Sequence, residues 1–214
     1  MIAQLAAYEP LPAGFYDRPA EVVARELLGA ILVSVVDGEL TTGRIVETEA
    51  YPGPHDPASH AAERIGRTAR NEPMFGPPGI AYVYRIYGIH WCLNAVTGRV
   101  GYPAAVLIRA VEPLEGVEVM RRRRFGVGGR AEGRGREGRA RKDRELTSGP
   151  GRLAQAFAIT GALDRHPLQA PPLLITAGTP VDPSSVATGP RIGITRAVDL
   201  PLRFYVRANP WVSR

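Results

Sequence analysis

The stretch "GRIVETEAYPGPHDPASHA", from Gly43 to Ala61, gathers acidic, aromatic and imidazole side chains where a strand-like pattern gives way to proline and glycine. Because side chains alternate along a strand, Glu47, Glu49 and Tyr51 are expected on one face. A carboxylate inside an otherwise apolar strand and next to a loop can serve as a general base, and Glu49 is the candidate for that role. A salt bridge to Arg44 or to another arginine would explain the same residue without any chemistry.

The histidines of this loop suggest a second kind of chemistry. His55, Asp56 and His60, together with Glu49, carry the imidazole and carboxylate ligands that suit zinc, iron or manganese. A metal-dependent nuclease could be built on such a set. His-x4-His in a proline-rich loop is not a specific metal pattern, so the sequence favours a site with no metal and no cofactor.

Aromatic side chains crowd the next apolar segment, "GIAYVYRIYGIHWCLNAVTG". Rings on strands usually belong to the core, which is the interpretation of Tyr82, and Cys92 is interpreted as a buried structural thiol. Tyr87 differs, because it stands beside the glycine of an expected tight turn. A ring there would project from the fold, and an exposed aromatic at a hairpin tip suggests a wedge between stacked bases.

Turn and periodicity signals predict the elements that must position these residues. Residues 17–29 predict a helix with Asp17 as its N-cap, and residues 30–51 predict two strands joined across Asp37-Gly38. A second hairpin is expected to turn near Tyr87. Strands and helices mix without regular βαβ alternation, so the fold class is α+β with a largely antiparallel sheet. At 214 residues, one compact domain is expected.

Positive charge is concentrated in one segment. The net charge is +6, yet residues 121–144 hold eleven basic and three acidic side chains, so the rest of the chain sums to −2. The run "EPLEGVEVMRRRR" predicts a helix, and the glycine-rich part after it cannot bury itself, so residues 121–141 are expected to form a mobile loop. Attraction to phosphates, with Arg121, Arg122 and Lys142 as backbone contacts, is the preferred interpretation. A solubilising insertion or a localisation signal is the alternative.

A short motif, "SGPGRL", precedes the next predicted helix, which begins near Ser148 with Pro150 in its first turn. Free backbone N–H groups at a helix start, the Ser148 hydroxyl and the Arg152 guanidinium could together contact a phosphate. The same residues also make an ordinary helix cap, so the motif alone does not decide between the two.

Composition narrows the class of protein. The chain is 44% hydrophobic without an apolar run long enough to span a membrane, and its first residues lack the charged region and cleavage site of a secretion signal. A single cysteine excludes an internal disulfide framework and a thiolate zinc cluster. A soluble protein of the reducing cytoplasm is therefore expected, associated with the nucleoid if the source is bacterial.

Five ordered blocks of the chain resemble the alkyladenine (3-methyladenine) DNA glycosylase family. They are "GRIVETEAYPGPHDPASHA", "GRTARNEPMFGPPGIAYVYRIYGIHWCLNAV", "VLIRAVEPLEGVEVM", "KDRELTSGPGRLAQAF" and "PLRFYVRANPWVS". The Arg/Gly stretch 125–139 has no counterpart. The resemblance implies one α+β domain over residues 16–214, after a loose tail of residues 1–15, with a largely antiparallel curved sheet, flanking helices and a protruding β-hairpin.

The resemblance also implies an activity. The enzyme would excise alkylated or deaminated purines from duplex DNA, among them 3-methyladenine, 7-methylguanine, hypoxanthine and ethenoadenine, without a metal. Glu49 would activate the attacking water, and Arg109 would lie near that water and the phosphate backbone. Such an enzyme would be monofunctional, would leave an abasic site, and is expected to act as a monomer.

Roles for the remaining residues follow from the same resemblance. Tyr51, His60 and Tyr84 would line the base pocket. Tyr87 would occupy the space vacated by the flipped nucleotide, and Asn94 would crowd the N2 amino group of guanine. A non-catalytic RNA-binding module that uses the Arg/Gly segment is the rival outside enzymes.

Overall fold

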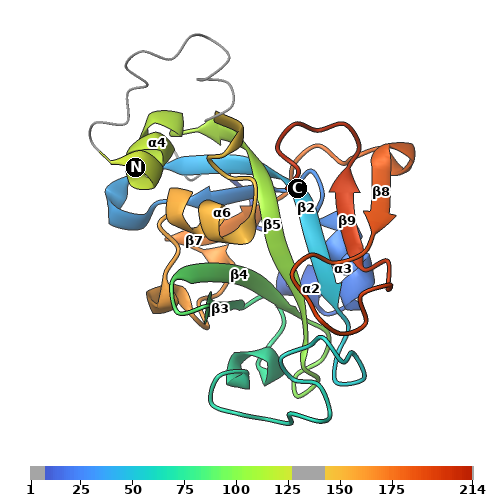
Figure 1. The fold of residues 1–214 in the computed structure, drawn as a ribbon. Helices are drawn as coiled ribbons and strands as arrows, with labels where there is room; N and C mark the ends of the chain where they lie inside the picture. The colour runs from blue at the N-terminus through green and yellow to red at the C-terminus, as the bar shows by residue number, and fades with distance from the viewer. Residues whose placement is uncertain (1–7, 127–142, 214) are drawn as a thin grey trace.

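Antiparallel strand pairing organises the fold in the computed structural model, which describes residues 8–126 and 143–213. The strands are β1 (Ile31–Ser34), β2 (Thr41–Tyr51), β3 (Ala81–Ile86), β4 (His90–Thr97), β5 (Ala104–Glu115), β6 (Gln169–Ala170), β7 (Leu173–Thr176), β8 (Val186–Gly189) and β9 (Arg203–Val206). They join in the order β3-β4-β5-β2-β1-β7-β6, and β9 pairs with both β2 and β8. The long pair β2 and β5 forms the centre of the sheet, which curls across the molecule (Figure 1).

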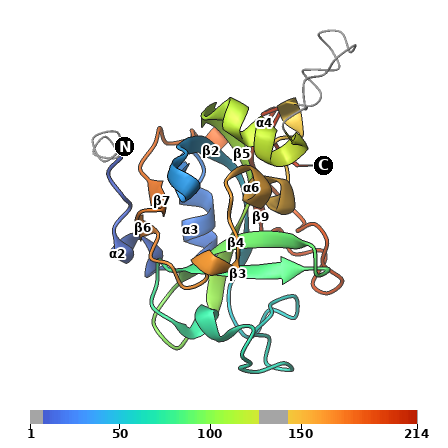
Figure 2. The same cartoon turned by 90° about the vertical axis from the view of Figure 1, so that its left-hand side faces the viewer.

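Helices cover the sheet at two places. They are α2 (Ala13–Tyr16), α3 (Ala20–Glu26), α4 (Val117–Phe125) and α6 (Pro150–Ala156). α3 packs against β2 and β5, whereas α4 and α6 pack against each other and α6 also meets β4 and β5. The turned view in Figure 2 shows α4 and α6 together, apart from α3. The chain is therefore one α+β domain, as its mixture of elements predicts.

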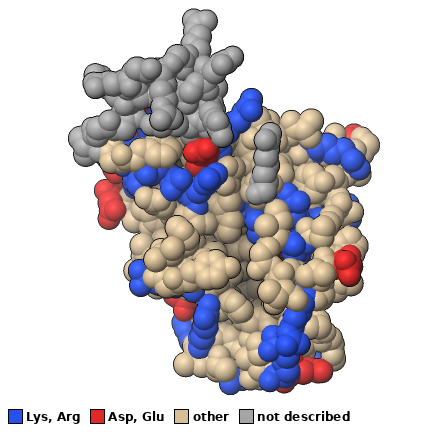
Figure 3. Space-filling view, in the orientation of Figure 1, with Lys and Arg blue, Asp and Glu red and all other residues tan. Residues whose placement is uncertain are grey.

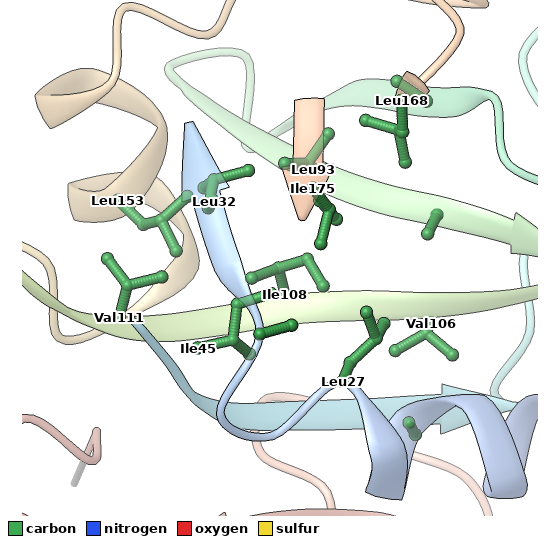
Figure 4. Close-up of a cluster of buried hydrophobic side chains, with 14 of the residues drawn as sticks. Leu27, Leu32, Ile45, Leu93, Val106, Ile108, Val111, Leu153, Leu168 and Ile175 are labelled. Carbon is green, nitrogen blue, oxygen red and sulfur yellow. The ribbon is translucent and has the colours of Figure 1, made fainter. Parts of the chain in front are cut away.

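Aliphatic side chains from these layers meet in one core. Figure 4 shows Leu27 at the C-cap of α3, Leu32, Ile45, Leu93 and Ile108 of the strands and Leu153 of α6 directed toward one another. These six side chains are fully buried. Such burial gives the largest favourable contribution to folding, about 1.5–3 kcal/mol for each large aliphatic side chain. The core includes side chains of β2 and β5, and both strands carry candidate site residues.

Both predicted hairpins have the expected strand pairing. β1 and β2 pair antiparallel with Ser34 opposite Thr41, and Asp37 in the connection has a positive φ of 57°. β3 and β4 pair antiparallel around a turn in which the Ile89 amide donates to the Ile86 carbonyl. That the second hairpin protrudes from the fold stays a prediction.

Several predicted boundaries were wrong. Asp17 does not cap a long helix: it follows α2, and α3 begins after Pro19 without a side-chain cap. The helix predicted from Glu112 starts at Val117, because β5 continues to Glu115 and Gly116 then turns the chain with a positive φ of 71°. At that glycine a Cβ atom would lie 2.2 Å from the Leu40 carbonyl oxygen, so no larger residue fits.

The two segments predicted to be loose are partly ordered. Pro10 forms a bridge to Thr176, and Phe15 packs against the core, so the tail predicted over residues 1–15 is packed from Pro10 onward. Residues 121–125 of the predicted Arg/Gly loop belong to α4. Residues 1–7 and 127–142, which include most of that loop, lie outside the described residues. In the part of the chain that the structure describes, no helix is long and apolar enough to cross a membrane.

Candidate active site

A cavity of about 580 Å³ lies where β2, the β3–β4 hairpin, β5 and the start of α6 meet the loops 57–64 and 192–196. Most of the residues proposed from the sequence line it, although they are spread over the chain. The lining includes Tyr51, His60, Tyr84, Tyr87, Asn94, Arg109, Ser148 and Arg152. The fold thus brings together residues from four of the five sequence blocks around one cavity.

Glu49 is held directly behind the wall of this cavity. Its side chain is fully buried, and three cavity-lining residues bind it. The Ile192 amide donates to Oε1 at 2.7 Å, Arg109 Nη1 lies 3.2 Å from the same oxygen, and the Tyr51 hydroxyl donates to Oε2 at 3.0 Å. The arginine alternative is thus realised with Arg109 rather than Arg44, and it coexists with a position at the cavity.

Glu47 shares the face of β2 predicted for Glu49 and has a different environment. Its Oε1 accepts hydrogen bonds from Arg109 Nε at 3.1 Å, Arg203 Nε at 2.6 Å and the Ser213 hydroxyl at 2.9 Å. The Ser213 amide donates to its Oε2 at 2.6 Å. Glu47 therefore ties β2, β5, β9 and the C-terminal segment together, away from the cavity.

Arg109 reaches both glutamates because of an irregularity in the sheet. β2 and β5 pair Glu47 with Ala110 and Thr48 with Ile108, so Arg109 falls in a register shift between them. Arg109 is thus an extra residue of β5 without a partner on β2. Such an extra residue changes the direction of a side chain and often lies beside an active site. Arg109 is buried between the two carboxylates and also lines the cavity.

Burial dominates the electrostatics of Glu49. Loss of water around the carboxyl raises the pKa of Glu49 above the ordinary value of a glutamate. The Arg109 charge, the Ile192 amide and the Tyr51 hydroxyl oppose this rise by stabilising the carboxylate. A raised pKa in a carboxylate held beside a cavity is suited to a general base.

Aromatic and imidazole rings form one wall of the cavity. The ring centroids of His60 and Tyr84 lie 4.5 Å apart, and those of Tyr82 and Tyr84 lie 5.2 Å apart. His60 Nδ1 is 2.9 Å from the Tyr82 hydroxyl, so Tyr82 is both part of the core, as predicted, and a partner of the site. Burial and then the Arg70 charge lower the pKa of His60 to about 4, so its imidazole is neutral at pH 7.

Asn94 and Tyr87 lie on the same hairpin at different depths. Asn94 is buried, and its side-chain amide donates to the Tyr82 carbonyl at 3.0 Å. Tyr87 is 81% exposed and has a positive φ of 52°, next to Gly88 at 70°. Two successive positive φ values define the tight hairpin turn that suits twisted strands, although a tyrosine is costly there. The Tyr87 ring is thus exposed at the turn, and its role as a wedge stays a prediction.

The metal set considered from the sequence is dispersed. Asp56 forms a buried ion pair with Arg191, His55 pairs with Glu63 at the surface, and His60 contacts Tyr82. Among residues 8–126 and 143–213, no three His, Cys, Asp or Glu side chains gather in a way that could hold a metal ion. The geometry gives no support to the metal-dependent nuclease.

The chain was compared with known proteins. A family model described as methylpurine-DNA glycosylase (MPG) matches residues 14–210. The chain belongs to the methylpurine-DNA glycosylase family. A relative from Myxococcus xanthus is 48% identical over 207 residues, covering 95% of this chain and 93% of its own. One from Carboxydothermus hydrogenoformans is 46% identical over 205 residues, covering 95% and 98%. Both carry the provisional name 3-methyladenine DNA glycosylase.

Membership defines the class of reaction. A methylpurine-DNA glycosylase is a hydrolase of DNA repair, so the substrate of this chain is DNA. The family resemblance stated from the sequence blocks is thereby confirmed, and so is the assignment as an enzyme. The RNA-binding rival is excluded as the principal activity.

The predicted backbone contacts of this glycosylase have different surroundings. Arg121 pairs with Asp143 and Glu118, and Arg122 pairs with Glu39, so neither charge is unopposed. Lys142 lies outside the described residues.

The start of α6 also differs from the sequence interpretation. Gly149 rather than Ser148 precedes the helix, and its amide donates to the Arg109 carbonyl at 3.1 Å. Ser148 accepts from Arg152 at 3.3 Å, and both line the cavity. These two side chains remain candidates for a phosphate contact, whereas the Gly149 amide is already engaged.

Other residues of the cavity were missed by the sequence interpretation. Arg64, Arg196 and the backbone of Ile192 line it, and Arg191 anchors the loop that carries Ile192. The segment between β8 and β9, which carries Ile192, is a loop. Figure 3 shows basic side chains spread over this face of the glycosylase, with acidic ones mostly toward its outline. Single arginines have no sequence motif that would have distinguished them.

Proposed function

We propose that this glycosylase flips a damaged purine from duplex DNA into the cavity and hydrolyses its N-glycosidic bond with a water activated by Glu49. The product would be an abasic site. The observation that carries the proposal is the placement of Glu49, a buried carboxylate of raised pKa whose three partners all line the cavity. The lesions proposed are 3-methyladenine, 7-methylguanine, hypoxanthine and ethenoadenine.

Extrusion of the base is the first requirement. A purine inside a duplex is out of reach of Glu49, so the enzyme must pay an unstacking cost of a few kcal/mol, which damage or mispairing reduces. Tyr87 is the proposed wedge, because its exposed ring projects from a tight turn at the cavity edge. Arg64, Arg152 and Arg196 are exposed at the same cavity and are suited to the DNA backbone.

Recognition of the base follows from the rings of the wall. Alkylation at a ring nitrogen makes a purine cationic, and a cation over an aromatic face gains about 0.5–2 kcal/mol. Tyr51 and Tyr84 offer such faces. His60 is neutral at pH 7, so it adds ring surface without repelling a cationic base. Asn94 lies deeper, where its amide would crowd the N2 amino group of an undamaged guanine.

Access of water to Glu49 requires a small rearrangement. Oε1 is already held by Arg109 and the Ile192 amide, and Oε2 accepts the Tyr51 hydroxyl. Oε2 is therefore the oxygen that a water can reach when the Tyr51 hydroxyl turns away. Cleavage builds positive oxocarbenium character on the sugar, so the carboxylate can take the proton of the water and also stabilise the developing charge.

Release of free base tests the proposal. The purified chain would be incubated with duplexes that contain alkylated purines or hypoxanthine, with and without EDTA, and the free base would be measured. We expect release on both arms of the experiment. Strand scission that EDTA abolishes would instead support the metal-dependent nuclease, and binding without any base release would contradict the proposed catalysis.

A further inference from the structure

We propose that Arg191 and Asp56 form a positioning clamp that holds the Ile192 amide and the Tyr51 ring against Glu49, and that the clamp sets the pH range in which Glu49 works as a base. The inference rests on the proposed role of Glu49 in excision. Neither residue of the clamp touches the cavity, so both would act through the groups that they hold.

The clamp joins two loops that are far apart in sequence. The Arg191 and Asp56 side chains have relative exposures of 0% and 1%. Both guanidinium Nη atoms bind the carboxylate, and Nη2 lies 2.9 Å from Oδ1. Arg191 Nη1 also donates to the Ala50 carbonyl at 3.0 Å, on the strand residue between Glu49 and Tyr51. Two-point contact of this kind fixes the direction of the arginine as well as its distance.

Arg191 contacts or adjoins both groups that donate to the two oxygens of Glu49. Ile192 follows Arg191 directly, and its amide donates to Oε1 at 2.7 Å. The Arg191 guanidinium lies 4.7 Å from the centre of the Tyr51 ring, whose hydroxyl donates to Oε2 at 3.0 Å. A buried arginine therefore braces both hydrogen-bond donors from behind. Loosening the clamp would let the loop and its Ile192 amide withdraw from the carboxylate.

Withdrawal has a measurable consequence. The Ile192 hydrogen bond stabilises the ionised form of Glu49 and so holds down a pKa that burial raises. Its loss would raise the pKa of Glu49 further, because the carboxylate would lose a donor that stabilises its ionised form. Protonated Glu49 cannot take a proton from water. The acid limb of the excision rate would then move to higher pH.

The charged and titratable groups around Glu49 decide in which direction its pKa would move if only a charge were removed. They are Glu47 and Tyr51 on β2, Arg109 on β5, Cys92 on β4, and Arg191 with its partner Asp56. Removing the Asp56 charge takes a negative charge away from this set. Electrostatics alone would then lower the pKa of Glu49, whereas loss of positioning would raise it. The direction of the shift separates the two causes.

Asp56→Asn and Arg191→Lys are the informative variants. Asp56→Asn keeps the size of the side chain and removes the charge, and Arg191→Lys keeps both charges but removes the two-point contact. Single-turnover rates of base release on a hypoxanthine duplex would be measured against pH. We expect the acid limb to move to higher pH in each variant, with a loss at neutral pH that higher pH partly restores.

Thr48→Val is the matched control. Thr48 is buried on the opposite face of β2, where its hydroxyl donates to the Ala24 carbonyl at 2.8 Å. Its loss should lower the melting temperature without moving the acid limb. If Asp56→Asn does not fold, the pH dependence of base release by Arg191→Lys tests the clamp. An unmoved limb, or a downward shift in Asp56→Asn, would overturn the clamp while wild-type excision stands. Absence of base release by the wild type would overturn the proposed function instead.

Discussion

Glu47 and Glu49 lie two residues apart on one face of β2, and both are fully buried, yet their surroundings differ in kind. Glu47 accepts from two arginines and from both the amide and the hydroxyl of Ser213. Glu49 shares one of those arginines, but its other partners, the Ile192 amide and the Tyr51 hydroxyl, belong to the wall of the cavity.

This difference teaches that burial alone does not identify a reactive carboxylate. A buried ionised group must be paired to be tolerated, and both glutamates meet that condition. What distinguishes Glu49 is the place of its partners, because a hydroxyl at the cavity wall can turn toward a ligand whereas the anchored C-terminal segment cannot. We therefore propose that Glu47 holds the fold together and that Glu49 carries the chemistry.

The largest expected effect is on excision by Glu49→Gln. We expect the single-turnover rate to fall on the order of 100- to 10,000-fold, the usual contribution of a positioned acid or base, while affinity for lesion DNA is retained. The amide keeps the size of the side chain, so the cavity should keep its shape. Rates of base release and equilibrium binding would be measured on the same duplex. A rate within tenfold of the wild type would remove Glu49 from the mechanism.

Glu47→Gln should affect stability instead. Removing one partner of a buried ion pair typically costs about 3–5 kcal/mol, because the remaining charge is left without compensation. Here Arg203 would lose its carboxylate and the Ser213 contacts would weaken. Urea unfolding of both glutamine variants measures the contrast. Equal losses of stability in the two variants would contradict the division of roles.

The pH dependence gives a smaller and more graded effect. Because burial raises the pKa of Glu49, the carboxylate is lost on acidification at a higher pH than for an ordinary glutamate. The rate should fall about tenfold per pH unit below that limb. Burial lowers the pKa of His60 to about 4, so the imidazole titrates on the acid side of this limb.

Stability should follow the same titration with the opposite sign. A raised folded-state pKa means that the folded protein favours protonated Glu49, so the ionised side chain weakens folding as pH rises through that range. Thermal unfolding of the wild type and of Glu49→Gln across pH would measure this. The variant should gain relative to the wild type as pH rises, and a relative loss would show that the pKa is lowered rather than raised.

The sequence predicted the shared face of Glu47, Glu49 and Tyr51, because that face depends on the period of a strand and on nothing distant. It could not predict what each glutamate contacts. Ser213 lies 166 residues from Glu47 along the chain, and Arg191 lies 135 residues from Asp56. Such pairs are set by the topology of the whole sheet, which local patterns do not contain.

Tertiary packing also decides which apolar residues of a helix are buried. In α3, Val22 is 40% exposed, whereas the neighbouring Val23 is fully buried. The roles of the base-pocket residues came from the family resemblance, because no local pattern assigns them. The resemblance assigns roles only to residues inside its five blocks.

The last prediction expects no effect of borohydride: no covalent complex between the enzyme and DNA should form. Cleavage of the strand through a Schiff base needs an amine with a lowered pKa, and Lys142 is the single lysine among the 27 basic residues. Arginine cannot take its place, because a guanidinium does not give up its proton. If Glu49 acts through water, borohydride should trap no complex with lesion DNA, and the product strand should break only after hot alkali. Denaturing gels with and without borohydride would measure both. An adduct that Lys142→Ala abolishes would transfer the chemistry from the carboxylate to an amine, and the contrast between Glu49 and Glu47 would lose its catalytic meaning.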